Sequence, residues 1–223
     1  MLAQRSKHYL QSFPKRFERL IRHFFLSDLG VSQSFGLKLL KWFPGLIVLI
    51  IDLVALPEVY DCFTNICKPG IRELDDAEFT AAQQIFRESI PLADVRIDQH
   101  ARVGPKQWRF AYVSFFTINI YGAMPIHLLI HELVHVWQYM NYGSMYIVHA
   151  LFAQHSDEGY NYGGLKTLKK AMDQNGYLTD FNFEQQADIV RDYYLLTRGQ
   201  KAQWSRATSD DLDLYDYFVK QLV

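Results

Sequence analysis

The segment between Met124 and Gly143 contains the pattern His-Glu-x-x-His, formed by His131, Glu132 and His135, and this pattern requires a helix. Residues four apart lie one turn above each other on a helix, so the two histidines direct their imidazoles to one point. Glu132 is rotated by about 100° from His131, which places its carboxylate beside that point. The arrangement is typical of zinc hydrolases, in which the glutamate accepts a proton from water.

The surroundings of the pattern favour a buried helix. Pro125 suits the first turn, where its missing N–H is not needed, and Gly143 suits the C-terminal cap. The side chains between them are apolar almost all round: Leu128, Leu129, Ile130, Leu133, Val134 and Trp137. The pattern arises by chance in about one chain of this length in a hundred. Histidines and a glutamate in such a helix are costly without partners, and a metal ion removes that cost.

His127 lies one turn before His131 and extends the same helix face. We expect His127 to pack or to support a ligand rather than to bind the metal, because Glu132 fixes the register of the pattern. A catalytic zinc then needs a third protein ligand and an open position for water.

Glu184 is the best candidate for the third ligand, since it begins the sequence Glu-Gln-Gln-Ala-Asp on a predicted helix. Asp188 lies four residues later on the same face and is placed to hold the free N–H of a ligating histidine. Spacing alone leaves Asp157, Glu158 and Asp188 itself open as competing ligands.

Composition restricts the classes of protein to which the chain can belong. The 223 residues are 49% hydrophobic and carry a net charge of −1, which gives no electrostatic case for a nucleic-acid partner. Cys62 and Cys67 are predicted to be reduced structural cysteines, with a local disulfide as the alternative in an oxidising compartment. No cleavable signal peptide is visible, so we expect synthesis in the cytoplasm, with membrane association or export by a specialised secretion system as alternatives.

The chain is predicted to be α+β, with a helical extension in residues 1–70 and a mostly helical domain in residues 71–223. Met1 to Arg22 has the pattern of an amphipathic helix. Phe35 to Leu56 is apolar but too short for a bilayer span, so a buried helix or docking hairpin is favoured over a peripheral membrane contact. Residues 57–70 are predicted to be a turn-rich connector.

A small β-sheet is predicted to precede the metal-binding helix. Residues 95–98 favour a short strand, and residues 110–121 favour one long strand or a hairpin. We interpret 110–121 as the wall along which an extended substrate lies, with a core strand as the alternative. Further helices are predicted in residues 75–89, 146–154, 165–175 and 182–196, with a closing helix after Gly199.

The pattern His131-Glu-Leu-Val-His135, followed by Glu184-Gln-Gln-Ala-Asp188, resembles the gluzincin, or thermolysin-like, zinc metallopeptidases. More narrowly, residues Ile71 to Leu196 resemble small bacterial metallopeptidases associated with Vgr and Rhs proteins and with contractile injection systems. The resemblance implies a zincin-like fold and one zinc ion bound by His131, His135 and Glu184. It also implies Glu132 as the general base, Asp188 as support for a histidine, a peptide or protein substrate and an association with a secretion system.

The interval between His135 and Glu184 is longer than in thermolysin-like enzymes and holds a polar, Tyr-rich loop. These enzymes stabilise the oxyanion with a Tyr or His donor. Tyr160 is our first choice for this catalytic role, and Tyr162 and His155 are the alternatives. We therefore expect a zinc metallopeptidase. Two other readings stay open, a metal-stabilised binding module without catalysis and a membrane-associated effector or toxin.

Overall fold

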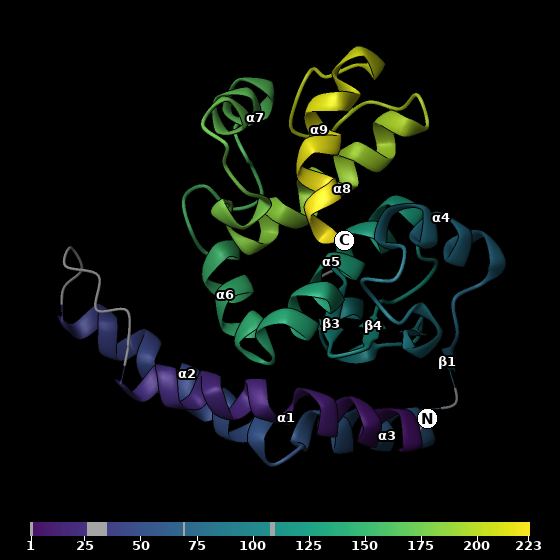
Figure 1. The fold of residues 1–223 in the computed structure, drawn as a ribbon. Coiled ribbons are helices and arrows are strands. Elements are labelled where there is room, and N and C mark those ends of the chain that lie inside the picture. Colours follow the sequence, from purple (N-terminus) through teal and green to yellow (C-terminus); the bar gives the residue numbers. More distant parts are fainter. Residues whose placement is uncertain (1, 26–34, 69, 108–109) are drawn as a thin grey trace.

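The computed structural model describes residues 2–25, 35–68, 70–107 and 110–223 (Figure 1). Its α-helices are α1 (Leu2–Phe25), α2 (Phe35–Leu53), α3 (Leu56–Cys67), α4 (Asp76–Phe86), α5 (Ile126–Tyr142), α6 (Met145–Gln154), α7 (Gly164–Asp173), α8 (Phe183–Thr197) and α9 (Leu212–Val219). Its strands are β1 (Ile71–Arg72), β2 (Arg96–Asp98), β3 (Tyr112–Ser114) and β4 (Thr117–Asn119). Short turns of other helix types are η1 (Leu92–Asp94), η2 (Arg102–Lys106), η3 (Leu178–Asp180), η4 (Ser209–Asp211) and η5 (Lys220–Leu222).

The four strands form one small mixed sheet in the order β1-β2-β4-β3. β2 and β4 run parallel with Ile97 opposite Ile118, whereas β3 and β4 form an antiparallel hairpin with Val113 opposite Ile118. All four strands precede α5 in the chain, so the α+β class and the position of the sheet are confirmed. The region 110–121 is a hairpin rather than one long strand, and Phe115 in its turn has a positive φ of 62°.

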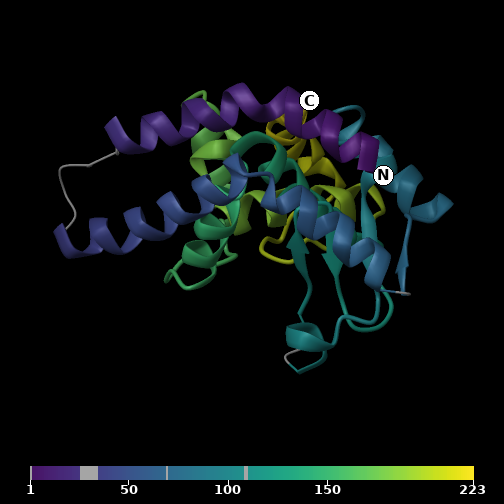
Figure 2. The ribbon, with the colours of Figure 1, turned by 90° about the horizontal axis from the view of Figure 1, so that it is seen from below.

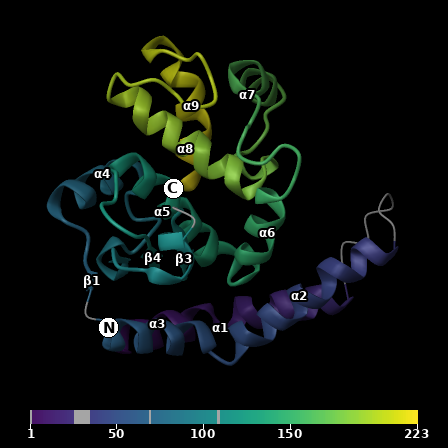
Figure 3. The same cartoon turned by 180° about the vertical axis from the view of Figure 1, so that it is seen from behind.

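Helix α5 runs through the centre of the molecule, between the sheet and α8 (Figures 1 and 3). Every residue from Leu129 to Tyr139 is buried, which confirms the prediction of a buried helix. Leu129 and Leu133 join Ile97 and Ile118 of the sheet in the hydrophobic core, and all four are 0% exposed. The helix that carries the His-Glu-x-x-His pattern is therefore fixed on both sides by packed side chains.

The predicted helices of the second part of the chain are present, with ends that differ by a few residues. α4 begins at a capping box formed by Asp75 and Glu78, and it ends at Phe86, three residues before the predicted end. α8 begins at a second capping box, in which Asn182 accepts a hydrogen bond from Gln185 N. The closing helix after Gly199 is α9.

Helices α1, α2 and α3 form a layer along one side of the molecule, which we call the N-terminal layer (Figures 1 and 2). Residues 57–70 do not form a turn-rich connector, because α3 occupies most of this segment. Pro57 misled the prediction: it lies in the first turn of α3, where proline is tolerated. Cys62 and Cys67 both lie on α3 as free thiols.

The N-terminal layer is joined to the rest of the molecule by buried polar contacts. Arg5 pairs with Asp61 at 2.7 Å and donates to the carbonyl of Asp94. Asp52 accepts from the backbone N–H of Ser144 at 2.7 Å, immediately after α5. Among the helices in the described part of the chain, none combines the length and the apolar character needed to cross a bilayer.

Candidate metal centre

The two ends of α5 are set by residues with distinct backbone conformations. Pro125 is the N-cap residue, one position before the helix, rather than part of its first turn. Gly143 is the C-cap residue and has a positive φ of 62°, as the sequence predicts for a capping glycine. The side chains of Arg19 and Asp52, from the N-terminal layer, also lie where a Cβ on residue 143 would be. A side chain at position 143 would therefore be disfavoured by both conformation and contact.

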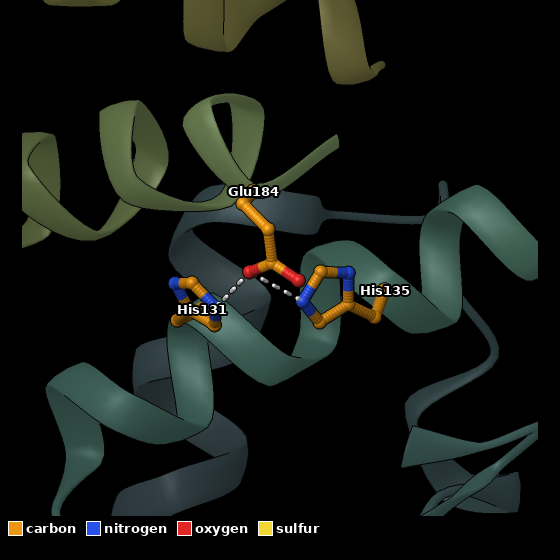
Figure 4. Close-up of side chains that lie close together, drawn as sticks. All are labelled: His131, His135 and Glu184. Atoms are coloured by element: carbon orange, nitrogen blue, oxygen red, sulfur yellow. Dashed lines mark ion pairs between the residues drawn. The ribbon is translucent and has the colours of Figure 1, made fainter. Parts of the chain in front are cut away.

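His131 and His135 on α5 and Glu184 on α8 point toward one another (Figure 4). Glu184 Oε2 lies 3.3 Å from His131 Nε2 and 3.5 Å from His135 Nε2. One candidate ligand atom from each residue lies within 4.8 Å of the others, and all three residues are buried. In the described residues this is the one group of three or more such side chains gathered closely enough to hold a metal ion.

The outward nitrogen of His131 is held by a network behind the cluster. Its Nδ1 lies 2.6 Å from Asp188 Oδ1, and the other oxygen of Asp188 accepts from the indole N–H of Trp204 and pairs with Arg191 at 2.9 Å. A carboxylate at this position fixes the proton on Nδ1 and leaves Nε2 free to bind a metal. The structure thus places Asp188 beside a histidine, as the sequence predicts.

The outward nitrogen of His135 is held by an amide instead of a carboxylate. His135 Nδ1 donates to Gln138 Oε1 at 2.8 Å, and Gln138 Nε2 donates to the carbonyl of Phe183 and to Gln186 Oε1. Gln138 therefore orients the second histidine and ties α5 to the start of α8. Glu184 is oriented too, because its Oε1 accepts from Gln154 Nε2 at 2.7 Å.

The ionisable groups of the cluster influence one another strongly. Burial lowers the pKa of His131, but hydrogen bonds to Asp188 and Glu184 outweigh burial and raise it to about 10. Burial opposes ionisation of Glu184, yet His135 and His131 hold its pKa well below the usual range. Burial also raises the pKa of Glu132. The positive charge of the protonated imidazoles thus balances the negative charge of the carboxylates. A bound metal ion would take over this role.

The donor set fits zinc. Two imidazole nitrogens and one carboxylate oxygen are the ligands of many catalytic zinc sites, and bonds of about 2.0–2.2 Å separate tetrahedral ligands by about 3.3–3.6 Å. The two measured nitrogen–oxygen separations, 3.3 and 3.5 Å, fall in that range. Glu132 Oε2 is buried and forms no hydrogen bond in the described part of the chain, and Glu184 Oε2 is buried with only the two imidazole contacts near it. A buried oxygen without a partner is costly, and a zinc ion with a bound water would give both oxygens one.

A cleft of about 580 Å³ opens onto the cluster. His131, Glu132 and Tyr160 line it together with Arg191 and residues of the sheet region: Pro105, Lys106, Phe110, Ala111, Ile120, Tyr121 and Leu128. The segments flanking the β3–β4 hairpin thus form one wall of the cleft. Residues 110–121 are interpreted from the sequence as the wall along which a substrate lies. The ring of Tyr160 lies 6.1 Å from that of His131, and burial together with nearby carboxylates raises the pKa of its hydroxyl.

The alternative oxyanion donors lie elsewhere. Tyr162 is buried and donates to Asp192 at 2.6 Å, and His155 is exposed and contacts the carbonyl of Leu151 through Nδ1. Neither residue lines the cleft that contains His131 and Glu132. Of the three candidates, Tyr160 is the one that the structure places at the cluster.

The competing ligands are also separated from the cluster. Asp157 and Glu158 are exposed in the loop before Tyr160, and neither belongs to the group that could hold a metal ion. His127 is exposed, so the prediction that it packs inside or supports a ligand is wrong. It lies in the first turn of α5, before the buried part of the helix begins at Leu129.

A second and larger cavity, of about 770 Å³, is lined by Tyr60, Cys67, Lys68, Asp98, His100 and Tyr112 among others. It contains no member of the His131, His135 and Glu184 cluster. Lys68 in its wall is already paired with Asp98 at 2.8 Å. The smaller cleft is therefore the one where the candidate chemistry is placed.

Comparison with known proteins gives one match. No family model matches the chain, and no solved structure matches it significantly. The chain is 31% identical over 143 residues to the type VI secretion system spike protein VgrG2b of Pseudomonas aeruginosa. The match covers 56% of this chain and 13% of that protein, so the chain spans about an eighth of its relative. The chain is thus linked to a bacterial protein of a secretion system, in agreement with the coarser part of the resemblance seen in the sequence.

Three residues of the centre were missed by the sequence reasoning: Gln138, Arg191 and Trp204. Gln138 lies three residues after His135 on one helix face, and this spacing was the signal that could have identified it. Arg191 lies three residues after Asp188 and could have been found in the same way. Trp204 reaches Asp188 from a loop beyond α8, and no local spacing predicts such a contact.

Proposed function

We propose that the protein is a zinc-dependent hydrolase, and specifically a metallopeptidase of the gluzincin type. The observation that carries this proposal is the convergence of His131, His135 and Glu184 in a buried cluster whose outward histidine nitrogens are both already held. Glu132 supports it further, because its carboxylate lies in the wall of the adjoining cleft and has a buried oxygen without a hydrogen bond.

Each residue in the cleft has a role in this proposal. Zinc supplies a Lewis acid that lowers the pKa of water in the site and polarises a substrate carbonyl. Glu132 accepts a proton from the attacking water on its carboxylate and delivers it to the leaving nitrogen. Its raised pKa suits both halves of this transfer. The Tyr160 hydroxyl donates to the oxygen on which negative charge develops.

The substrate is proposed to be an extended peptide. The cleft is lined on one side by the segments that flank the β3–β4 hairpin, and β3 is an edge strand of the sheet. An edge strand offers backbone groups with which an extended chain can pair. The similarity to a spike protein of a type VI secretion system supports an association with such a system, and export by it, for this chain too.

The test combines metal content with catalysis. Purified protein is expected to hold one zinc per chain by elemental analysis and to cleave peptides in a mixed peptide library, as followed by mass spectrometry. Glu132→Gln is expected to keep zinc and lose at least about a hundredfold in rate. His131→Ala is expected to lose both zinc and activity. Hydrolysis retained by purified Glu132→Gln contradicts the mechanism.

The same experiment separates the catalytic reading from a metal-stabilised binding module. The three proposed ligands leave a fourth position for water. A binding module would have a further protein ligand there, and His127 and Asp157 are exposed and lie outside the cluster. One zinc per chain without cleavage of any peptide, in wild type and Glu132→Gln alike, would support the binding module.

A further inference from the structure

In the N-terminal layer several charged side chains are buried, and many large apolar side chains are exposed. Arg16 and Glu58 form an ion pair in which both side chains are buried, and Asp52 and Asp61 are each 1% exposed. The apolar side chains of the same helices include the most exposed large hydrophobic residues of the described chain, with Leu10 at 69% and Ile66 at 71%. A surface helix in water normally shows the opposite arrangement.

The exposed apolar residues of α1 form one continuous stripe. They are Leu10, Phe13, Phe17, Ile21 and Phe24, separated by three or four residues, which places them on one face of the helix. Arg5 and Arg16 lie on the opposite face, against the rest of the molecule. Helix α1 is therefore docked through its cationic face.

Helices α2 and α3 continue this surface. Their exposed apolar residues include Phe43, Ile47, Ile50, Val54, Val59, Phe63 and Ile66. Asp52, Glu58 and Asp61 on the same two helices are buried against α1 and the rest of the molecule. Figure 2 shows α1 beside α2 and α3 in front of the remaining elements, so the outward sides of the three helices form one face. We call it the apolar face.

The charge around the apolar face is positive. Lys7, Lys15 and Arg22 are exposed on other sides of α1, and the exposed carboxylate of the same helix, Glu18, is paired with Arg22 at 2.6 Å. Residues 1–70 contain nine Lys or Arg and five Asp or Glu, a formal charge of +4, whereas residues 71–223 carry −5. The chain thus concentrates positive charge in the segment that exposes apolar side chains.

We propose that the apolar face is a docking surface for an anionic lipid bilayer, in which α1, α2 and α3 lie in the plane of the membrane. Apolar residues bordered by lysine and arginine are the features with which helices bind at the level of lipid headgroups. The proposal does not depend on the metal centre.

The test is flotation of the full-length protein with vesicles. We expect it to float with vesicles of phosphatidylcholine and phosphatidylglycerol in a 3:1 ratio and to bind pure phosphatidylcholine at least tenfold more weakly. The variant Leu10→Gln/Phe17→Gln/Ile21→Gln is expected to stay in solution with both. These side chains are exposed, so circular dichroism and thermal unfolding should not change.

Two further variants make the result specific. Leu151→Gln/Tyr177→Gln/Val223→Gln removes three exposed apolar side chains outside the N-terminal layer and is expected to float like wild type. Lys7→Gln/Lys15→Gln keeps the apolar stripe and removes two charges. It is expected to bind anionic vesicles at least tenfold more weakly and neutral vesicles unchanged, since each basic residue near an anionic surface strengthens binding about fivefold.

Two outcomes overturn the proposal. One is folded wild-type protein that remains unbound to both kinds of vesicle. The other is a concentration-dependent dimer in sedimentation that disappears in the Leu10, Phe17 and Ile21 variant, because the face would then be covered by a second copy of the chain. Zinc content measured on the same samples is a separate readout that the layer variants are expected to leave unchanged.

Discussion

Trp204 donates its indole N–H to Asp188, the carboxylate whose other oxygen lies against His131. The loop beyond α8 thereby helps to orient His131, a candidate metal ligand, through Asp188. Trp204→Phe removes this donor and keeps most of the ring. We expect zinc affinity to fall about tenfold, because partners that orient a ligand typically contribute 10–100-fold. Chelator competition measures this, and Trp42→Phe, which alters a ring stacked on His23 far from the centre, is the control.

Gln138 connects His135 to α8, and its replacement should therefore affect both metal binding and stability. In Gln138→Leu the Nδ1–H of His135 and the carbonyl of Phe183 lose their partner. We expect a fall of about tenfold in zinc affinity and of about 1–3 kcal/mol in the free energy of unfolding. Gln83→Leu, at an exposed position of α4, should change neither in denaturant titrations. Equal effects in the two variants would contradict the role of Gln138.

Tyr160 and Tyr162 make a matched pair, since they are two residues apart but have different surroundings. Tyr160→Phe removes a hydroxyl from the cleft, and we expect kcat to fall about 10²–10³-fold with little change in KM. Tyr162→Phe removes a buried hydroxyl bonded to Asp192 and Tyr215, so it should lower stability by about 1–3 kcal/mol and leave kcat unchanged. Steady-state kinetics and thermal unfolding distinguish the two. An unchanged kcat in Tyr160→Phe removes this residue from the mechanism.

Zinc removal should destabilise the fold because α5 and α8 are joined at the cluster. Zinc at a hundred times its Kd adds about 2.7 kcal/mol to the free energy of unfolding of a protein that binds it only when folded. Differential scanning fluorimetry should show a lower Tm in chelator and recovery on adding zinc. His131→Ala should be insensitive to both additions. A Tm of the wild type that does not respond to chelator would mean that the cluster holds no zinc.

Gly143 combines a positive φ of 62° with the neighbouring Asp52 side chain at the place of the missing Cβ. Gly143 has a ψ of −157°, a backbone region that is essentially restricted to glycine, so Gly143→Ala should lower the free energy of unfolding by more than the roughly 1–3 kcal/mol of such a conformation alone. Gly199 is the matched control, with a φ of 67° and nothing within 4 Å of its Cβ position. We expect a larger loss in the Gly143 variant than in the Gly199 variant in denaturant titrations. Equal losses would contradict this prediction.

The sequence predicts best where local chemistry is sufficient. A turn of helix brings His131 and His135 together, and a capping box starts α8 two residues before Glu184, so both pieces of the centre can be placed without knowing the fold. Their meeting, although 49 residues separate His135 from Glu184, was expected from the Glu184-to-Asp188 spacing and from the resemblance to known metallopeptidases. The network behind them includes Trp204, whose contact with Asp188 results from packing and leaves no periodic signal.

The orientation of the N-terminal layer could not be predicted from local chemistry. The amphipathic pattern of α1 is visible in the sequence, but periodicity does not say which face meets the protein. Arg5 and Arg16 turn inward because α3 supplies Asp61 and Glu58. The sequence did not predict α3, since residues 57–70 were expected to be a turn-rich connector. Tertiary pairing of charges therefore determined an orientation that hydrophobic patterning alone would reverse.

The contacts between the N-terminal layer and α5 have a practical consequence for anyone shortening this chain. Tyr139, one turn after His135, donates its buried hydroxyl to Glu58, and Ser144 is bonded to Asp52. A fragment beginning at residue 71 would lose both partners and uncover Phe116, against which Arg5 now packs. The sequence boundary near residue 70 is thus a poor place to cut for expression or crystallisation. A shortened protein would expose the Tyr139 hydroxyl and other groups that are now buried along α5, the helix that carries His131, Glu132 and His135.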